Sequence, residues 1–380
     1  MALTADGIIG RENELAAIGA FLASVRDGPA GLVLHGEPGI GHTMLWKEAV
    51  ATARRQGFRV LACRPVQSET RLSYGGIGDL LEEVLDDVLP SLPEPQRNAL
   101  EVALLRAAAT HGHPDQRAAS LAVLGALRVL ADSHPVLVAV DDVEWLDTSS
   151  ARLLRFALHR LKDESVGIQL SVRSGDAEQD PLGLSAELPI GRVTGLRVGP
   201  LDVKAIDRVL RSRLGTSLQR TTLVQLHRTS GGNPFFALEI ARSLLEKQLA
   251  AEPGHALPVP DSLQDLIRDR LARLPAEARR ELQIVAALSQ PTISLVEAAS
   301  KGRRDANGLR PAIEAGVLEV EGERLRFSHQ LLASAVYHSM TPDHQQRLHR
   351  SLAEIVTDPE ERARHLALSV EGPDSDVALA

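Results

Sequence analysis

The chain has 380 residues, of which 44% are hydrophobic, so it is long and apolar enough for two or three folded domains. Its 42 basic and 50 acidic residues give a net charge of −8, which disfavours non-specific binding to nucleic acid or to a membrane surface. The single cysteine, Cys63, excludes an intramolecular disulfide, and neither a signal pattern nor a membrane-length apolar run is present, so we expect a cytoplasmic protein.

The first thirty residues predict one amphipathic helix that ends at the Asp-Gly-Pro of residues 27–29. Its apolar residues recur at helical spacing: Leu15, Ile18, Phe21, Leu22 and Val25. The Gly-Arg-Glu of residues 10–12 precedes the helix. On local grounds a helix start is favoured there over a contact with a nucleotide base.

Residues 31–47 carry the strongest signal in the chain. An apolar run at residues 32–34 is followed by the glycine-rich stretch GEPGIGHT and then by an apolar helical pattern. This strand–loop–helix order matches the phosphate-binding pattern G-x-x-x-x-G-K-[ST] at every fixed position except one. His42 occupies the position of the lysine.

The parts of such a loop contribute separately to phosphate binding. Gly36, Gly39 and Gly41 allow positive φ angles, so that successive backbone N–H groups can surround an anion. The following helix adds its N-terminal dipole, and the hydroxyl of Thr43 can bind Mg²⁺. His42 is shorter than lysine, and an ordinary imidazole is mostly neutral at pH 7. We therefore expect a site that still binds phosphate but stabilises transferring charge poorly; the alternative is a tight turn without a ligand.

The next segments predict a parallel βαβ unit, with a helix at residues 44–56 and a buried strand at 58–63. Residues 64–130 are expected to be mostly helical. Two histidines, His111 and His113, lie beside glycine and proline and have no cysteine or acidic residue in a ligand pattern. They predict a surface turn rather than a metal site.

Residues 135–142 predict a second buried strand, which ends in the carboxylates Asp141 and Asp142. The carboxyl edge of a parallel sheet is where ligands bind. There one carboxylate can hold Mg²⁺ and the next can orient an attacking water. The alternative role is helix capping, but Asp147 or Thr148 already serves to begin the next helix.

Two further strands are expected. Residues 166–173 form a buried strand that ends in Arg173, which is either a solvated strand end or a sensor of the γ-phosphate. Residues 192–198 predict a short fifth strand, followed by Gly199 and Pro200.

The remainder of the chain is expected to be mostly helical from residue 202. A turn is predicted within residues 230–236, and the proline-containing segment 251–260 has the composition of a linker. Residues 341–370 are again helical, and residues 371–380 end abruptly, as if a longer architecture continued.

Residues 257–340 predict a winged-helix domain. Helices at 262–274, 276–288 and 309–317 precede a hairpin at 318–327. Many winged helices bind DNA, but residues 261–350 hold 13 basic and 12 acidic side chains, a net charge of only +1. This balance favours a structural role over DNA binding. His329, which follows the hairpin, reads locally as an ordinary half-buried histidine.

Taken together, these motifs resemble the N-terminal ATPase module of the large ATP-binding regulators of the LuxR family, within the STAND class of signalling ATPases. The resemblance spans essentially the whole chain. It rests on Gly-Arg-Glu at 10–12, GEPGIGHT at 36–43, VLVAVDDVEWLD at 136–147, SVRSG at 171–175, Gly199-Pro200, SGGNPFF at 230–236 and FSHQLLASAVY at 327–337.

The resemblance implies an α/β P-loop NTPase fold, with a parallel five-stranded sheet followed by a helical lid and a winged-helix domain. The implied divisions are a nucleotide-binding domain at 1–200, a lid at 201–256, a winged helix at 257–340 and the start of a helical region at 341–380. The implied ligands are ATP or ADP and Mg²⁺.

The resemblance also implies a role for each site residue. Gly41, His42 and Thr43 would face the phosphates, and Asp141 would hold Mg²⁺ together with Thr43. Asp142 would orient the attacking water, and Arg173 would contact the γ-phosphate. Arg11 and Pro200 would line the base pocket, and His329 would contact the β-phosphate. The nucleotide site as a whole would comprise Gly10, Arg11, Gly36, Glu37, Pro38, Gly39, Ile40, Gly41, His42, Thr43, Met44, Pro200 and His329.

Three functional hypotheses follow. The first is a nucleotide-binding signalling switch with weak or no hydrolysis, which acts on a protein partner or by self-association and not on DNA directly. The second is a scaffold that no longer binds nucleotide. The third is an ATPase in which another cation replaces the missing lysine. The sequence departs from the family in two ways. His42 in place of lysine argues against efficient hydrolysis, and the absence of a helix-turn-helix argues against direct regulation of transcription by this chain.

Overall fold

The computed structural model describes residues 8–66, 70, 72–107, 114–173, 182–246, 263–300 and 308–370. The chain divides into two compact units. The first comprises Met1–Val209 with Gly232–Phe235, and the second comprises Leu210–Gly231 with Phe236–Ala380.

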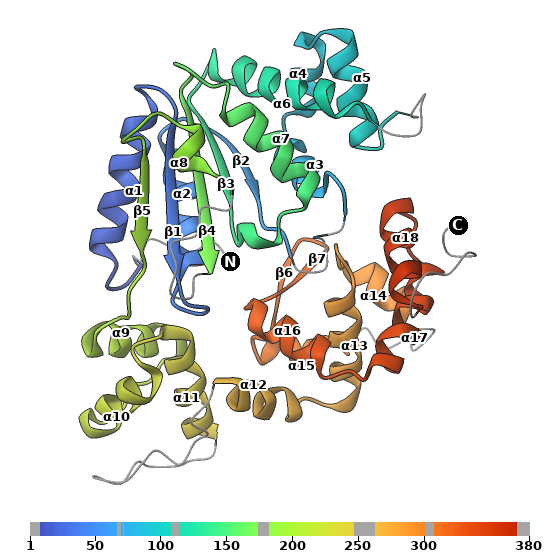
Figure 1. Cartoon of the computed structure of the whole chain (residues 1–380). Helices are drawn as coiled ribbons and strands as arrows, with labels where there is room; N and C mark the ends of the chain where they lie inside the picture. The colour runs from blue at the N-terminus through green and yellow to red at the C-terminus, as the bar shows by residue number, and fades with distance from the viewer. Residues whose placement is uncertain are drawn as a thin grey trace. The chain divides into compact units, whose positions relative to one another are not determined.

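The first unit is built on a five-stranded sheet in the order β2-β3-β4-β1-β5, in which every neighbouring pair is parallel (Figure 1). Each strand predicted from the sequence is present, with bounds that differ by at most two residues. The strands are β1 Ala30–Gly36, β2 Arg59–Cys63, β3 Val136–Val140, β4 Val166–Arg173 and β5 Val193–Arg197.

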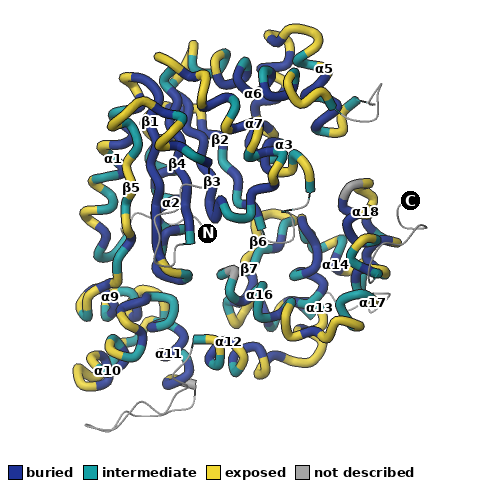
Figure 2. Tube along the Cα trace, in the orientation of Figure 1, coloured by how far each residue is buried: buried dark blue, intermediate teal, exposed yellow. Residues whose placement is uncertain are grey.

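The central strands are buried on both faces, which explains their nearly continuous apolar sequences (Figure 2). Alternate residues of β1 belong to different cores, because successive side chains point to opposite faces of a strand. Leu32 and Leu34 pack with helices α1 and α2, whereas Val33 packs with the core that includes α3, α5, α6 and α7. The sheet is therefore covered by helices on both sides, as a parallel sheet requires.

The helices of this unit largely follow the predicted order. Asp115 caps α6 by accepting hydrogen bonds from two backbone N–H groups. The helical segments are α1 Glu12–Val25, α2 His42–Arg55, α3 Gly75–Leu81, α4 Leu85–Val88, η2 Leu89–Ser91, α5 Glu94–Ala103, α6 Gln116–Ala131, η3 Val143–Trp145, α7 Thr148–Leu158, α8 Leu184–Glu187 and α9 Val203–Leu214, whose last residues belong to the second unit.

The second unit is helical apart from one antiparallel hairpin, β6–β7, which turns at Gly322 with a φ of +64°. The hairpin confirms the one expected at 318–327, while its assignment to a winged helix and the four domain boundaries remain predictions. The elements are α10 Arg220–Ser230, α11 Pro234–Glu246, α12 Leu263–Ala272, α13 Ala276–Ala287, α14 Ile293–Ala299, α15 Arg310–Glu314, β6 Leu318–Glu321, β7 Arg324–Phe327, α16 Gln330–His338, α17 Pro342–Ala353 and α18 Pro359–Leu368.

Two local expectations need correction. Helix α2 begins at His42 and not at Met44, so His42 lies in its first turn. Helix α14 was not expected, because its seven residues are too few to show a clear helical period; Thr292 caps it by accepting from the N–H of Leu295. The expected linker at 251–260 and the pair His111 and His113 lie outside the described residues.

Candidate functional site

The loop between β1 and α2 has the backbone that its glycines predicted. Gly39 and Gly41 adopt φ angles of +86° and +111°, which non-glycine residues rarely adopt. Gly36 has no room for a side chain, since a Cβ there would lie 2.6 Å from Cγ2 of Ile40. The loop therefore turns tightly enough to present backbone N–H groups at the N-terminus of α2.

Residues far apart in the sequence hold this loop in place. The buried side chain of Arg11 donates to the carbonyl of Ile40 at 2.7 Å and to that of Gly199 at 2.7 Å. Asn233 donates to the carbonyl of Pro38 at 3.0 Å, and the N–H of Phe235 donates to that of Gly39. Sequence reasoning missed the role of Asn233, because a contact across 195 residues leaves no periodic signal.

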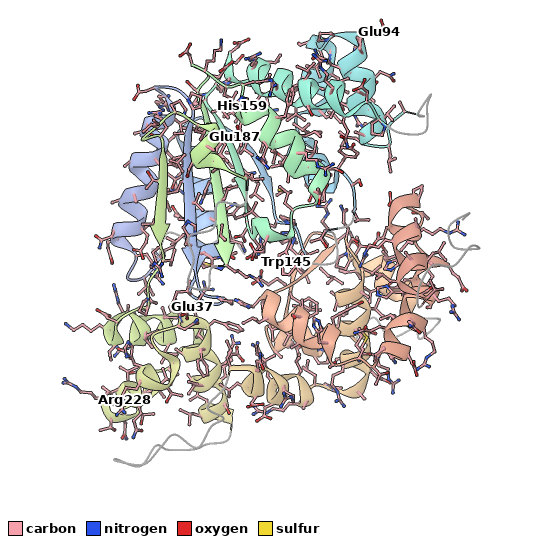
Figure 3. All side chains as sticks on the ribbon, in the orientation of Figure 1. Glu37, Glu94, Trp145, His159, Glu187 and Arg228 are labelled. Atoms are coloured by element: carbon pink, nitrogen blue, oxygen red, sulfur yellow. The ribbon has the colours of Figure 1, made fainter. Side chains whose placement is uncertain are left out.

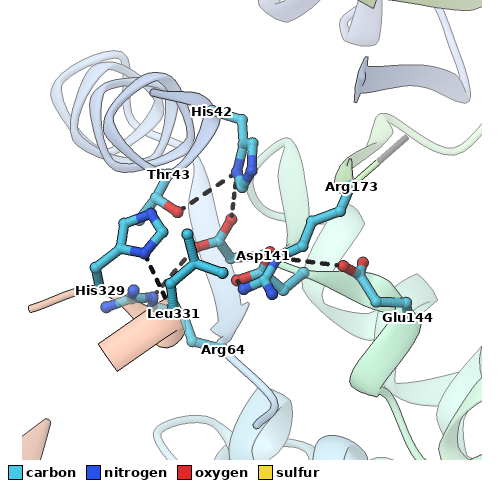
Figure 4. A network of polar contacts seen from close by, with 9 residues as sticks. His42, Thr43, Arg64, Asp141, Glu144, Arg173, His329 and Leu331 are labelled. Atoms are coloured by element: carbon cyan, nitrogen blue, oxygen red, sulfur yellow. Dashed lines mark hydrogen bonds and ion pairs between the residues drawn. The ribbon is translucent and has the colours of Figure 1, made fainter. Parts of the chain in front are cut away.

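The two consecutive carboxylates lie at the carboxyl end of β3, as expected. Both are buried. Asp141 accepts a hydrogen bond from Nε of Arg64 at 3.2 Å through Oδ2, and its Oδ1 lies 3.9 Å from Nδ1 of His42 (Figure 4). Burial raises the pKa of Asp141, but neighbouring His42 and the charge of Arg64 more than offset it and lower the pKa to about 2. Asp141 is therefore ionised at neutral pH.

Asp142 pairs with Arg173 at the end of the neighbouring strand β4. Nε and Nη2 of Arg173 donate to its two oxygens at 2.9 and 3.3 Å. Asp142 has a φ of +50°, a strained conformation for a residue with a side chain. Burial and the charge of Asp141 raise the pKa of Asp142, although Arg173 opposes the shift. The two residues expected to act in hydrolysis are thus bonded to each other.

Two charged neighbours of this group were not expected from the sequence. Arg64 directly follows β2, and Glu144 lies 3.5 Å from Nε of Arg173. Burial raises the pKa of Glu144, and the charge of Asp142 adds to the shift. The sequence could have identified Arg64 as a candidate site residue. Ligands bind at the carboxyl ends of parallel strands, and this rule, which located Asp141 after β3, applies equally to residues that follow β2.

His42 lies among these groups at the start of α2. Its side chain is buried, and Nδ1 lies 3.5 Å from the hydroxyl of Thr43 (Figure 4). Nε2 has no hydrogen-bond partner among the described residues, and neither has Oδ1 of Asp141. We refer to His42, Arg64, Asp141, Asp142 and Arg173 as the sheet-edge cluster.

Asp147 has the capping role that was considered for this region. It caps α7 by accepting from the N–H of Ser150 at 2.8 Å. It also accepts from the backbone N–H groups of Tyr74 and Gly76, which precede or begin α3. Asp147 is therefore a structural residue that joins two helices.

The other predicted site residues are distributed along the two units. In the loop, Ile40 is buried, Glu37 is exposed (Figure 3), and Pro38 and Met44 lie between these extremes. Gly10 has a φ of +70° and would place a Cβ only 2.7 Å from Ala205, so a glycine is required there. Pro200 is exposed just after β5.

His329 belongs to the second unit, where it caps α16. Its Nδ1 accepts a hydrogen bond from the N–H of Leu331 at 3.1 Å. Its predicted contact with a β-phosphate stays a prediction, as do the ligand contacts of all the other site residues.

The chain is similar to known proteins in sequence and in fold. Residues 8–171 match the AAA ATPase domain family. An uncharacterized protein of Rhizobium meliloti (strain 1021) is 25% identical over 391 aligned positions, which cover 91% of this chain but 36% of that protein. The chain thus spans little more than a third of the curated relative that it matches.

Solved structures that are similar to this chain are also found. A STAND protein with a tetratricopeptide repeat sensor from Pyrococcus horikoshii superposes with a TM-score of 0.57 at 13% identity, over 96% of this chain and 48% of that one. The Walker-type ATPase paby2304 of Pyrococcus abyssi gives a TM-score of 0.42 at 14% identity, over 87% and 97%.

No helix among the described residues has both the length and the apolar character needed to cross a bilayer. The fold is that of a P-loop NTPase, with a parallel five-stranded sheet and a helical C-terminal region. Residues 8–171 form the part of the chain that is similar to AAA ATPase domains.

Proposed function

We propose that this chain is an ATP- or ADP-binding signalling switch of the STAND type, related to the large LuxR-family regulators, with weak or absent hydrolysis. One observation carries the proposal. The loop with left-handed Gly39 and Gly41 leads into α2 beside the buried carboxylates Asp141 and Asp142, so that the glycine-rich loop and the two carboxylates lie at one sheet edge. The presence of His42 in place of lysine is the reason for expecting weak hydrolysis.

The chain offers suitable ligands for Mg²⁺ in Thr43 and Asp141. Asp141 is ionised, and its buried Oδ1 has no hydrogen-bond partner among the described residues, which fits a cation ligand. When bound, Mg²⁺ neutralises charge on the phosphates. Asp142 would orient the attacking water and Arg173 would contact the γ-phosphate, but each must first release the other. This pairing is a second reason to expect slow turnover.

Arg11 would support nucleotide binding through the loop that it holds. Its guanidinium donates to two backbone carbonyls, including that of Ile40 in the phosphate loop. Together with Gly10 and Pro200 it belongs to the segments that would border the base. His329, in the second unit, would contact the β-phosphate.

A competent ATPase is the second candidate, and Arg64 favours it. This permanently charged guanidinium hydrogen-bonds to Asp141 and lies in the same cluster as His42. A cation at this position would replace part of the charge that the lysine normally provides. Measurable multiple turnover that is lost in Arg64→Gln would favour this candidate.

We further propose that the cytoplasmic partner is a protein, or a second copy of this chain, and not DNA. The net charge of −8 and the near balance of charge at residues 261–350 give no electrostatic attraction to a duplex. A gel shift at physiological salt that survives competitor DNA would contradict this.

Calorimetric titration of the full chain with ADP and with ATP, each with Mg²⁺, tests the central proposal. Gly41→Ala should abolish binding, because a side chain at a φ of +111° distorts the loop. The matched control is Gly57→Ala, which also changes a glycine of positive φ but lies at the end of α2 with no atom within 4 Å of the new Cβ. It should bind as the parent does.

His42→Lys distinguishes the remaining hypotheses. The switch hypothesis predicts that the parent binds nucleotide and that His42→Lys binds it about tenfold more tightly or better, since hydrogen bonds to charged groups contribute about 1.5–3 kcal/mol. If neither the parent nor His42→Lys binds ADP or ATP, the chain is a scaffold and the proposal is wrong.

A further inference from the structure

Three side chains that commonly bind metals meet at the sheet edge: His42, Asp141 and Asp142. One ligand atom from each lies within 4.8 Å of the others, and all three residues are buried. In the part of the chain that the structure describes, no second group of three histidine, cysteine or acidic side chains has this arrangement.

The hydrogen bonding of the group provides an independent observation. Nε2 of His42 and Oδ1 of Asp141 are buried, and neither has a hydrogen-bond partner among the described residues. His42 is 4% exposed and Asp141 is 0% exposed, so bulk water does not satisfy them. Most buried polar atoms are hydrogen-bonded, so these two residues, which meet in one group, keep unused capacity to bind a ligand.

The distances suit a metal ion. Nδ1 of His42 lies 3.9 Å from Oδ1 of Asp141 and 3.5 Å from the hydroxyl oxygen of Thr43. Metal bonds of about 2.0–2.2 Å place the ligands of a tetrahedral ion about 3.4 Å apart. The two measured separations, 3.9 and 3.5 Å, are therefore close to the spacing of ligands around one ion.

The carboxylates also have the surroundings of metal ligands. Arg64 bonds to Oδ2 of Asp141, and Arg173 bonds to both oxygens of Asp142, so both carboxylates are oriented by outer partners. Each ionised carboxylate has about four lone-pair sites, which leaves positions for an ion.

The imidazole decides which ions are preferred. Mg²⁺ favours oxygen ligands, whereas nitrogen from histidine suits Zn²⁺, Co²⁺ and their neighbours in the first transition row. We propose that His42, Asp141 and Asp142 bind one such transition-metal dication, with the hydroxyl of Thr43 as a further donor. Binding does not need nucleotide, so this site goes beyond the proposed function. The ion places positive charge near the position where the phosphate-loop pattern has its lysine.

Co²⁺ provides a direct probe, because its visible absorption reports bound nitrogen and oxygen ligands. The full chain, first treated with a chelator, is titrated with Co²⁺ without nucleotide. One equivalent should bind with a new visible band; Zn²⁺ should remove the band, and about a tenfold excess of Mg²⁺ should not. His42→Gln should weaken binding by at least about 100-fold, because loss of an outer partner alone typically weakens it about 10–100-fold.

The matched control is His159→Gln. His159 is exposed on the same unit and pairs with Glu187 (Figure 3), so it tests for binding at surface histidines. The control should retain the band and the affinity. The proposal is wrong if His42→Gln binds Co²⁺ as the parent does, if His159→Gln loses as much, or if Mg²⁺ displaces Co²⁺ equally well.

A second variant, His42→Lys, distinguishes loss of the metal site from misfolding of the chain. It also separates the metal proposal from the proposed nucleotide binding. The lysine restores the common phosphate-loop residue, so the variant should keep the far-UV circular dichroism spectrum of the parent while it loses the Co²⁺ band. Retention of the band in His42→Lys would overturn the metal site. A parent protein that binds Co²⁺ but does not bind ADP would instead contradict only the proposed function.

Discussion

Each unit of this protein buries a group of polar side chains, and the two groups differ in how well they are bonded. In the sheet-edge cluster, His42 and Asp141 have buried atoms without hydrogen-bond partners among the described residues. In the second unit, His349 bonds through Nε2 to the hydroxyl of Tyr337 at 2.9 Å and through Nδ1 to Nδ1 of His365 at 2.7 Å.

The rest of the second group is bonded with one exception: Nε2 of His365 has no hydrogen-bond partner among the described residues and lies 3.7 Å from Oε1 of Glu361. Glu361 accepts from the N–H of Ser289 at 2.8 Å, and Arg364 donates to the hydroxyl of Ser289 and to the carbonyl of Ala287. We refer to Tyr337, His349, Glu361, Arg364 and His365 as the helical cluster.

Among the described residues, the helical cluster has one unbonded buried atom, whereas His42 and Asp141 of the sheet-edge cluster have two between them. A buried network whose members bond mainly to one another stabilises its fold, and removing a member leaves the others unpaired. A buried group that leaves more atoms unbonded and brings like charges together lowers stability, and such groups are typical of functional sites. The same residue types thus stabilise the second unit, while in the first unit they form the group for which we propose ligand binding.

The largest expected effect is that of His349→Ala. His349 is 1% exposed, and its removal leaves a cavity together with unpaired groups on Tyr337 and His365. We expect the free energy of unfolding of the second unit to fall by about 3 kcal/mol. His42→Ala removes the same side chain from the sheet-edge cluster and should cost about 1 kcal/mol or less. Denaturant titration followed by hydrogen exchange in α2 and α17 measures both; equal losses would remove the contrast.

Acidification should have the next largest effect, which is a lower free energy of unfolding of the second unit. Burial lowers the pKa of His349 to about 3, and the neighbouring His365 and Arg364 add to the shift, while Tyr337 bonds to its other nitrogen. The unfolded chain, with an ordinary pKa of about 6.5, therefore takes up the proton first. The resulting stability is present above pH 6.5 and is lost as the pH falls toward 3, by about 2 kcal/mol between pH 7 and pH 5.

The sheet-edge cluster should respond differently over the same range. The pKa of Asp142 is raised, so its ionised form disfavours folding at neutral pH and acid relieves that penalty. The lowered pKa of Asp141, about 2, delays its loss of charge to more acidic conditions. Hydrogen exchange at pH 7 and pH 5, corrected for intrinsic rates, should show α17 and α18 weakened selectively. His349→Leu should remove that selectivity, and its persistence would point to another group.

The smallest expected effect compares two buried carboxylates of the first unit. Asp142→Asn should stabilise that unit by up to about 1 kcal/mol, because it removes the cost of burying the charge and the repulsion from Asp141, while the amide oxygen can still accept from Arg173. Asp147→Asn should destabilise it by about 1–2 kcal/mol, since Asp147 accepts three backbone hydrogen bonds. Thermal unfolding of the two variants gives the sign of each change. Destabilisation by Asp142→Asn would make that carboxylate structural.

The sequence by itself determined the sheet, its buried strands and the positions of the key loops. A continuous apolar run identifies a strand buried on both faces, and glycines at fixed spacing identify a loop that needs positive φ angles; both are local properties. For the same reason the sequence located Asp141, Asp142 and Arg173 at strand ends, because carboxyl ends of parallel strands share one edge.

Only the tertiary structure decided which of these groups bond to one another. It paired Arg173 with Asp142, placed Arg64 on Asp141 and showed that Arg11 holds the carbonyl of Ile40. It also revealed the network of the helical cluster, in which His349 bonds to Tyr337 and to His365. Such contacts join segments that are distant in sequence, and they depend on strand order and side-chain direction, which no local pattern encodes.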